Sequence, residues 1–533
     1  MGEYSVPPLA CDTEPAWVSV GVGRVVVREE ARRAHGTVKC EFADVLFVTD
    51  ERVEEGAVTV SETAYELHAS DFVRVRCRAA DGATWQNVVA GVRAGAAPSA
   101  RRLDQLSPSQ LPLNVLIWGF DSLSRNTYER KLPKTVAFLR KQLGAVILQG
   151  YNIVGDGTPQ ALIPILTGQT EPELPETRKR FSSADFVNVY PFIWKKFADD
   201  GFVTAFNEDQ PHIGTFQYRL KGFMPQPTTH YMRPFYLATK PGFGRHKPHC
   251  LRDTPRHKVM TDYVEQLYAA YPHTAKFIFS FHSELSHDDV NLVGVADDDM
   301  VAFLTRMRNT GALNNTALLM MADHGHRFTA VRNTQQGKLE ERLPFVAWAL
   351  PAWVGQRYPE ALAALRQHAQ QLTTPFDLHQ TLQHLRHCLL RAGSAARGCA
   401  EAAQEAARAF ERYVNAEQER QTPGRCAPLR VEEILKAEVL QPQANLLRFV
   451  KSKDKDGFVP DLSSAGMTAQ PMMQLRMRAA PGARTFEVTM TRKGSGEFAV
   501  RHEDVSRTDR YGDQARCVAD RMDHMRKLCF CRD

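Results

Sequence analysis

The chain has 533 residues, of which 43% are hydrophobic and 24% are charged, with a formal net charge of +6. Because single hydrophobic cores stop growing at about 250 to 300 residues, this length predicts a large core and one or two further units. The composition is typical of a globular protein and argues against disorder as the main state. Lysine and arginine are scattered among 61 acidic residues, so the charge pattern excludes a clustered nucleic-acid surface, and no nucleic-acid partner is expected.

Residues 1–105 are predicted to form an N-terminal, cysteine-bearing β unit that ends in a linker. Segments such as WVSVGVGRVVV, GTVKCEF, DFVRVRCRA and WQNVVAGVRA alternate apolar and polar residues, which is typical of a small antiparallel sheet. The polar, proline-bearing stretch GAAPSARRLDQLSPSQLP is the expected linker. The first residues, MGEYSVPPLACDTEP, lack the basic start and apolar core of a signal peptide.

Residues 106–394 are predicted to form the main domain. Continuous apolar runs, typical of buried strands, alternate with amphipathic stretches, which are typical of helices. The expected strands are LNVLIWGF, AVILQGY, FVTAF, KFIFSF, TALLMMA and FVAWAL, and the expected helices include KTVAFLRKQL, PQALIPILTG and TTPFDLHQTLQHLRHCLLR. This order predicts an α/β fold, a three-layer sandwich with a mostly parallel central sheet.

Residues 395–533 are predicted to form a long helix followed by a small C-terminal β subdomain. Ala395 to Gln421 is rich in alanine, glutamate and arginine, and LRFVKSK, MMQLRMRA, TFEVTM and EFAVRH alternate like strands. No segment reaches the roughly 18 consecutive apolar residues of a membrane helix, so no transmembrane span is expected in this chain.

Ten dispersed cysteines favour disulfides in an oxidising compartment, the alternative being ten reduced thiols. We expect Cys11, Cys40 and Cys77 to serve the N-terminal sheet, and Cys517, Cys529 and Cys531 to serve the C-terminal end. Cys529 and Cys531 are too close in sequence to pair well, so each should have a different partner. Asn314 begins a glycosylation triplet. We therefore expect an extracellular or secretory-lumen protein whose signal peptide or anchor is missing from this chain.

Polar residues follow the predicted strands at the points where the strands end. LNVLIWGF ends at Asp121, FIFSF ends at His282 and the residues up to Asp289, and TALLMMA ends at Asp323 and His324. Sites in open α/β sheets form at the carboxyl ends of strands, and oxygen ligands with imidazole suit Zn²⁺ or Mn²⁺. Thr158 precedes Pro159, which predicts a capping role at a helix start. A hydroxyl there, beside a metal, can also attack phosphorus.

The motif order FDSLSR, GDGT, SHDD, DHGHR, EERLPF and TTPFDLHQTL resembles the alkaline phosphatase/sulfatase superfamily, most closely domain-of-unknown-function family 229. The resemblance implies an alkaline-phosphatase-like fold with one or two divalent ions (Zn, Mn, Mg or Ca). It also implies roles for particular side chains. The implied metal ligands are Asp121, Thr158, Asp323, His324 and His287; the implied catalytic groups are Thr158, His287 and Arg327; and the implied substrate-binding groups are Lys338 and His282.

The chain departs from two patterns of this superfamily. Sulfatases oxidise the Cys or Ser of a Cys-x-Pro-x-Arg motif to an aldehyde, whereas here Thr158 stands at that place and Leu162 where the arginine would be. Two-zinc phosphodiesterases use Asp-x-x-x-His, but Ser283 lies four residues before His287, which favours a single metal. Arg342 is expected to pair with Glu340 or Glu341.

The function expected from these features is metal-dependent hydrolysis or transfer of a phosphate ester through a threonine nucleophile. The substrate would be a small-molecule, glycan or lipid phosphate ester. The alternatives are a sulfatase-like sulfuric ester hydrolase, and a catalytically silent extracellular binding protein on the same fold.

Overall fold

The computed structural model describes residues 6–93, 95–106, 110–240, 249–328, 330–386, 390–391, 397–440, 451–454, 457–460, 472–492, 497–509, 512–519 and 522–532. The chain forms two compact units, Met1–Leu106 with Pro112–Gln383 and Ser107–Leu111 with His384–Asp533. The N-terminal β region, predicted as a separate unit, thus packs with the main domain. The boundary predicted at residue 394 falls within the second unit.

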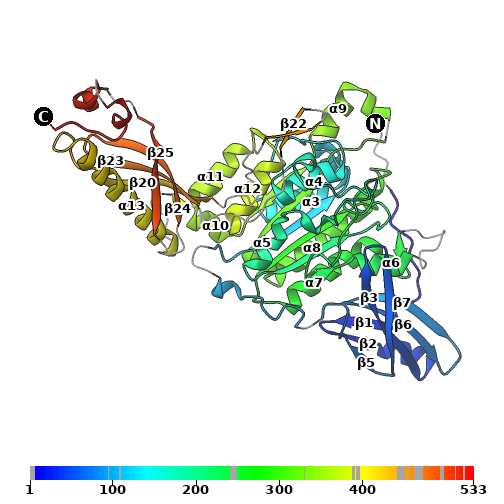
Figure 1. The fold of residues 1–533 in the computed structure, drawn as a ribbon. Helices are drawn as coiled ribbons and strands as arrows, with labels where there is room; N and C mark the ends of the chain where they lie inside the picture. The colour runs from blue at the N-terminus through cyan, green and yellow to red at the C-terminus, as the bar shows by residue number, and fades with distance from the viewer. Residues whose placement is uncertain are drawn as a thin grey trace. The chain divides into compact units, whose positions relative to one another are not determined.

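A seven-stranded sheet forms the centre of the first unit (Figure 1). Five neighbouring strands pair in parallel, and the two strands at one side pair in antiparallel fashion. In spatial order the strands are β12 (His230–Tyr231), β11 (Val203–Glu208), β15 (Lys276–His282), β8 (Asn114–Phe120), β16 (Thr316–Ala322), β17 (Val346–Ala349) and β9 (Val146–Ile147). The predicted mostly parallel α/β sheet is therefore confirmed.

Helices cover both faces of this sheet because its strands are apolar on both faces. On one face, Leu116, Trp118 and Phe120 of β8 share a core with side chains of α2, α3, α7 and α8. On the other face, Phe197 of α5 packs on Phe277 of β15 with ring centroids 4.6 Å apart, and α4 contacts α5. The helices are α2 (Arg125–Lys131), α3 (Pro133–Gln142), α4 (Thr158–Thr167), α5 (Ile193–Asp199), α6 (Arg233–Thr239), α7 (Arg256–Ala270), α8 (Asp297–Asn309), α9 (Gln335–Arg342), α10 (Ala352–Arg357), α11 (Pro359–His368) and α12 (Pro375–Arg386).

One predicted strand is divided in the structure. AVILQGY supplies β9 to the central sheet, and it then supplies β10 (Gly150–Tyr151), which pairs with β18 (Leu372–Thr373) in a separate parallel ladder. A further short hairpin joins β13 (Cys250–Leu251) to β14 (Thr254–Pro255). Periodicity alone cannot show where a strand changes its partner.

The N-terminal region consists of two antiparallel sheets and one helix. The strand order of the first sheet is β1 (Val18–Gly21), β2 (Arg24–Val27), β5 (Ala64–Glu66). The strand order of the second sheet is β4 (Arg52–Ser61), β3 (Val38–Thr49), β6 (Phe72–Ala79), β7 (Thr84–Ala90). The helix is α1 (Glu29–His35). Cys40 and Cys77 are register partners on β3 and β6 and form a disulfide. Cys11 instead pairs with Cys250. The expectation that Cys11 serves the N-terminal sheet is wrong, because its partner lies in the main domain.

The second unit packs α13 (Arg397–Gln421) on an antiparallel sheet, as the alternating pattern predicted. The sheet order is β19 (Leu390–Arg391), β20 (Arg430–Leu440), β23 (Met472–Ala480), β24 (Arg484–Arg492), β25 (Phe498–Arg507), and β21 (Lys451–Asp454) pairs with β22 (Gly457–Pro460). The predicted strand LRFVKSK lies largely outside the described residues.

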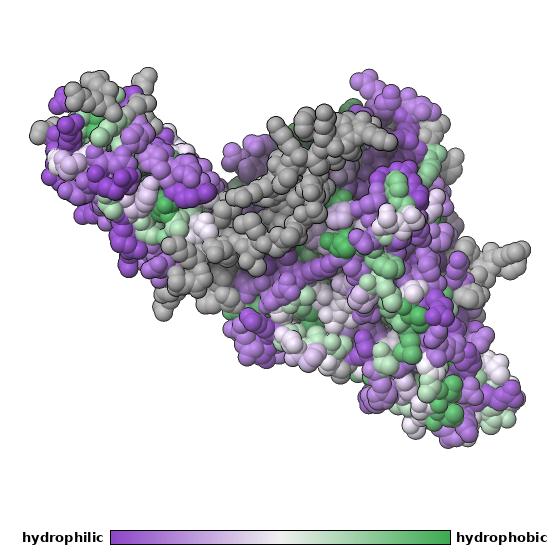
Figure 2. Space-filling view, viewed as in Figure 1, coloured by the Kyte–Doolittle hydropathy of each residue, from purple (hydrophilic) through white to green (hydrophobic). Residues whose placement is uncertain are grey.

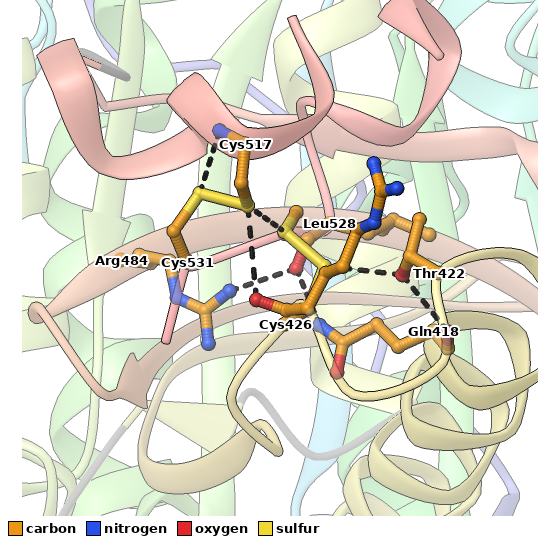
Figure 3. The surroundings of a disulfide bond; sticks show 9 residues. Gln418, Thr422, Cys426, Arg484, Cys517, Leu528 and Cys531 are labelled. Carbon is orange, nitrogen blue, oxygen red and sulfur yellow. Dashed lines mark hydrogen bonds between the residues drawn. A yellow bond between two sulfur atoms is a disulfide. The ribbon is translucent and has the colours of Figure 1, made fainter. Parts of the chain in front are cut away.

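Two disulfides, Cys426–Cys529 and Cys517–Cys531, anchor the C-terminal segment of the second unit (Figure 3). Cys529 and Cys531 have different partners, as predicted. The carbonyl oxygen of Leu528, the residue before Cys529, accepts hydrogen bonds from Gln418 Nε2 at 2.7 Å and Arg484 Nη1 at 2.8 Å. The end of the chain is thus bonded to α13 and to β24.

Hydrophilic residues predominate on the face in Figure 2, where hydrophobic residues form small separate areas. Among the helices that the structure describes, none combines the length and apolar character that crossing a bilayer requires.

The disulfide pattern generates a first prediction. Peptide mapping of unreduced protein secreted from cells should recover four cross-linked pairs, Cys11–Cys250, Cys40–Cys77, Cys426–Cys529 and Cys517–Cys531. Replacing both Cys40 and Cys77 with serine should lower the free energy of unfolding by about 4 kcal/mol, because the bond closes a loop of 37 residues. Free thiols at all eight positions would contradict the extracellular assignment.

Candidate metal centre and nucleophile

Strand register brings Asp121 and Asp323 together. Phe120 of β8 is the register partner of Ala322 of β16 in a parallel pair, so the next residue of each strand stands at the same edge. Side chains alternate along strands, and both carboxylates therefore project to the face opposite Phe120. Both residues are buried, with 2% and 0% of their surface exposed. The two acidic positions predicted from separate strand ends form one site.

The carboxylate of Asp323 is only half satisfied by hydrogen bonds. Its Oδ1 accepts the backbone N–H groups of Ser122 at 3.0 Å and His324 at 2.8 Å. Its Oδ2 is buried and has no hydrogen-bond partner among the described residues. Asp121 Oδ1 accepts the hydroxyl of Ser122 at 2.7 Å. A buried carboxylate oxygen without a partner is costly, and a cation would satisfy it.

His324 presents an unprotonated nitrogen to the same point. Its Nδ1 lies 2.9 Å from the carbonyl oxygen of Gly325, and because a carbonyl only accepts, Nδ1 carries the proton. Nε2 is then a lone-pair donor, and it lies 3.2 Å from Asp323 Oδ2. Two acceptors this close repel each other unless a proton or a cation lies between or beside them. The ligand atoms of Asp121, Asp323 and His324 all lie within 4.8 Å of one another, so this donor set fits a divalent ion such as Zn²⁺.

Thr158 is the first residue of α4, and its hydroxyl faces this cluster. Thr158 Oγ1 lies 3.4 Å from His324 Nε2. The N-cap of the helix is Gly157, and no side chain makes a capping hydrogen bond. The prediction that Thr158 caps the helix is therefore wrong: the helix starts one residue earlier than the proline rule indicated. The hydroxyl is directed toward the carboxylates and the imidazole instead of the helix backbone.

Two glycines permit this close arrangement. Gly157 has φ of +119°, a conformation that side chains rarely adopt, and a Cβ there would meet the Gln160 side chain at 2.8 Å. Gly325 has no room for a side chain, because a Cβ would lie 2.2 Å from the carbonyl oxygen of Glu340. The glycines of GDGT and DHGHR are thus required by backbone geometry.

Burial raises the pKa of both acidic groups in the metal-free protein. Burial, followed by the charge of Asp323, raises the pKa of Asp121 to about 6. Burial likewise raises the pKa of Asp323 to about 6, against the hydrogen bonds from Ser122 and His324. Burial lowers the pKa of His324, which keeps its imidazole in the neutral, metal-binding form. Removing the protons from both carboxylates near neutral pH is favoured when a cation takes their place.

Arg327 lies beside the start of α4. Its Nη1 donates to Asp156 Oδ1 at 3.0 Å, and it would lie 3.5 Å from a Cβ at Gly157. Arg332 donates to the other oxygen of Asp156 at 3.3 Å. The pairing with Asp156, the acidic residue of GDGT, was not predicted from the sequence. Two guanidinium groups therefore bind an exposed carboxylate that lies two residues before Thr158.

His287 stands at the rim of the site and contributes a favourable charge interaction to Asp121. Its Nδ1 lies 2.7 Å from Asp288 Oδ1, and its ring packs on Phe328 with centroids 5.1 Å apart. His326 packs on the same ring at 5.8 Å. The DHGHR motif contained the signal for His326, but sequence reasoning did not assign it a role. Phe328 is 59% exposed, so an open aromatic surface adjoins the site.

Three predicted residues are not placed in this cluster. The backbone carbonyl oxygen of His282 accepts the N–H of Asp121 at 3.0 Å, but the ring of His282 lies with Asp209 and Glu284. Lys338 is exposed on α9. The expected pairing of Arg342 is wrong, because Glu340 pairs with Arg130 and Glu341 with Arg332. Asn314, the expected glycosylation site, is exposed on the surface.

The TTPFDLHQTL motif supports the site from a distance. His379 of α12 is buried, and its Nδ1 donates to the carbonyl oxygen of Ile165 in α4 at 2.8 Å. Its ring also packs on Gly168, where α4 ends in a left-handed turn. This motif holds the end of α4 opposite Thr158.

Residues 6–408 match the family described as "Protein of unknown function (DUF229)", and the chain belongs to this family. No functionally curated protein sequence matches the chain. The predicted resemblance to this family is thereby confirmed.

Solved structures similar to the chain have low sequence identity. The phosphonate monoester hydrolase SpPMH from Silicibacter pomeroyi is 13% identical, with 78% of this chain and 96% of that chain covered and a TM-score of 0.37. An alkaline phosphatase superfamily protein from Vibrio parahaemolyticus is 10% identical over 82% and 89%, with a TM-score of 0.36. The C-terminal periplasmic domain of EcEptC from Escherichia coli, in complex with Zn, is 14% identical over 53% and 84%, with a TM-score of 0.36.

The half-satisfied carboxylate generates a second prediction. Asp323→Asn should remove one equivalent of tightly bound zinc per chain, because it replaces the charged oxygen that the ion would neutralise. Elemental analysis of chelator-washed, zinc-reloaded protein measures this loss. Asp299→Asn, which neutralises a carboxylate paired with His257 at a distance from the cluster, is the matched control and should keep the parent content. Equal zinc in the Asp323→Asn variant and the parent would contradict the site.

The raised pKa values generate a third prediction, on pH. In the metal-free protein both carboxyls bind protons near pH 6, whereas in the unfolded chain they do so near pH 3.8. Between these values the folded state holds more protons, so its free energy of unfolding rises as pH falls. Chelator-treated parent should gain Tm relative to Asp323→Asn between pH 7 and pH 5. The Tm of the zinc-loaded parent should instead fall between pH 7 and pH 5, because protons displace the ion from the carboxylates. Parallel Tm profiles for the two metal-free proteins would contradict the assignment.

Proposed function

We propose that the protein is a divalent-metal-dependent hydrolase or transferase of phosphate esters that uses Thr158 as its nucleophile. One observation carries the proposal: the Thr158 hydroxyl lies at a helix start, 3.4 Å from His324 Nε2 and beside an unsatisfied Asp323 oxygen. A hydroxyl with no capping role, directed at a set of metal-binding atoms, is the arrangement that nucleophilic catalysis on phosphorus requires.

Asp121, Asp323, His324 and the Thr158 oxygen would hold the ion. When bound, the ion supplies a lowered pKa for the Thr158 hydroxyl and positive charge for the phosphoryl oxygens. The cluster itself carries two carboxylates, which balance the charge of a divalent ion. The free N–H groups at the start of α4 add further stabilisation for an anion.

The remaining steps use side chains of this chain. Thr158 Oγ1 gives its proton to water and attacks phosphorus, a bond from Oγ1 to phosphorus forms, and the bond from phosphorus to the leaving oxygen breaks, which yields a phosphothreonine. Arg327, released from Asp156, binds the phosphoryl oxygens through charge-assisted hydrogen bonds. His287, whose Nδ1 is oriented by Asp288, protonates the leaving oxygen. Water completes hydrolysis, or an acceptor hydroxyl completes transfer, by attack on the same phosphorus. The bond from phosphorus to Thr158 Oγ1 then breaks, and Oγ1 takes up the proton that the attacking hydroxyl loses.

The surroundings favour a substrate with an apolar or flat group next to its phosphate ester. Phe328 is exposed beside His287 and His326, and an exposed ring is a stacking surface for a sugar, a base or a lipid head group. Four disulfides support an extracellular or secretory-lumen location for this chemistry. A threonine cannot form the aldehyde of sulfatases, which leaves sulfuric esters disfavoured.

The nucleophile generates a fourth prediction. Against a panel of phosphate mono- and diesters, Thr158→Ala should lose turnover about a thousandfold or more on any substrate that the parent cleaves. Thr158→Ser keeps the hydroxyl and should retain measurable activity. Because Gly157, and not Thr158, caps α4, both variants should melt close to the parent.

Three results would contradict this assignment in different ways. Near-normal turnover by Thr158→Ala would remove Thr158 as nucleophile. Labelled phosphate recovered on a residue other than Thr158 after acid quenching would do the same. Zinc-loaded parent that cleaves no ester in the panel would favour the catalytically silent binding protein.

A further inference from the structure

A second group of metal-binding side chains lies at the same edge of the central sheet but on its other face. Asp209 follows β11, His282 ends β15 and Glu284 follows it, and their ligand atoms lie within 4.8 Å of one another. His282 is the register partner of Phe120, and the two rings have centroids 5.7 Å apart. Phe120 and Asp121 point to opposite faces because side chains alternate. The Asp209 cluster is therefore distinct from the Asp121 cluster.

Backbone N–H groups orient the carboxylate of Asp209 toward His282. Asp209 Oδ1 accepts the N–H of Ser283 at 2.7 Å, and Oδ2 accepts the N–H of Glu284 at 3.1 Å. His282 Nε2 lies 3.3 Å from Asp209 Oδ2. The ends of β11 and β15 are thus already held together around the imidazole.

The imidazole of His282 is buried without a hydrogen bond. Its side chain is 1% exposed, and neither ring nitrogen has a hydrogen-bond partner among the described residues. Glu284 Oε2 is also buried, and it has no hydrogen-bond partner among the residues that the structure describes. Most buried polar groups in native proteins have a hydrogen-bond partner, so a buried imidazole without one, beside two carboxylates, points to a ligand at this place.

The charged side chains around His282 and Glu284 do not occupy the place between the imidazole and Glu284 Oε2. Arg256 Nη1 forms an ion pair with Glu284 Oε1, and His249 Nδ1 lies 3.4 Å from the same oxygen. Both contacts are to Oε1 and not to Oε2. His257 is 6.3 Å from His282 between ring centroids, but its Nε2 is taken by Asp299 at 2.7 Å. Two carboxylates against one guanidinium leave a net negative charge beside the imidazole.

We propose that Asp209, His282 and Glu284 bind a second divalent first-row cation, for which Zn²⁺ is the probe. One imidazole and two carboxylates are ligands that Zn²⁺ accepts, and three protein ligands leave a fourth position for water. The ion would tie the end of β11 to the turn that follows β15. That turn, closed by the N–H of His287 donating to the carbonyl oxygen of Ser283 at 2.9 Å, carries His287. The second ion is a positioning element beneath His287 and does not depend on the proposed phosphoester chemistry.

Zinc stoichiometry in the parent and four variants tests the proposal. Full-length parent, Asp323→Asn, Glu284→Gln and the double variant are stripped with a chelator, reloaded with Zn²⁺, washed and analysed for metal per chain. We expect two equivalents in the parent, one in each single variant and none in the double variant. His257→Gln removes a neighbouring buried histidine that already has a carboxylate partner, and it should keep both equivalents.

The outcomes separate this proposal from the proposed function. One equivalent in the parent and none in Asp323→Asn would overturn the second site and leave the first. One equivalent in both parent and Asp323→Asn, lost in Glu284→Gln, would support the second site and contradict the first.

A second measurement covers variants that fold poorly. Zn²⁺ should raise the Tm of Asp323→Asn by several degrees, and Co²⁺ in that protein should give visible absorption typical of nitrogen and oxygen ligation. Absence of both effects in the folded Asp323→Asn protein would mean that a proton, not a metal, bridges His282 and Asp209, and would overturn the proposal.

Discussion

The parallel, in-register pairing of β8 with β16 forces two buried carboxylates to the same point, and the site follows from that constraint. Burial raises the pKa of both carboxyls, and at Asp121 the charge of Asp323 raises it further. A positive charge relieves the repulsion. His324 presents its unprotonated Nε2 and Thr158 its hydroxyl to the same place, and Arg327 stands beside the helix start. The candidate metal ligands and the proposed nucleophile therefore meet because of one feature of the sheet.

Other parts of the first unit fix the positions of α4 and of the strand end that carries His324. α4 is held at its start by the positive-φ Gly157 and at its end by His379. Gly325 lets the backbone of α9 pack directly on the strand end that carries His324. His379, which lies in the TTPFDLHQTL motif, acts by fixing the backbone of α4. A nucleophile must be held to within a fraction of an ångström for catalysis, so these supports matter as much as the ligands.

Buried polar networks explain why the N-terminal sheets belong to the first unit. Asp71 Oδ2 accepts from His230 at 2.7 Å and from the Tyr263 hydroxyl at 3.0 Å. Asp50 accepts from Gln217 at 2.7 Å and from the Tyr231 hydroxyl at 2.9 Å. Each carboxylate comes from the N-terminal region, and each partner comes from the main domain. Such buried bonds are costly to break singly, so this region is part of the scaffold and not a tethered module.

Sequence by itself determined the α/β class, the strand ends that carry chemistry and the family, because continuous apolar runs and the polar residues after them are local properties of the chain. It also indicated the cysteine-rich ends. Only the tertiary structure decided which of those residues meet. Strand register separated His282 from Asp121 by placing them on opposite faces, and the N-cap of α4 is Gly157 instead of Thr158. Cys11 forms a disulfide with Cys250, 239 residues away, and Arg327 forms an ion pair with Asp156. Face, register and long-range pairing depend on neighbours distant in sequence, and no local pattern records them.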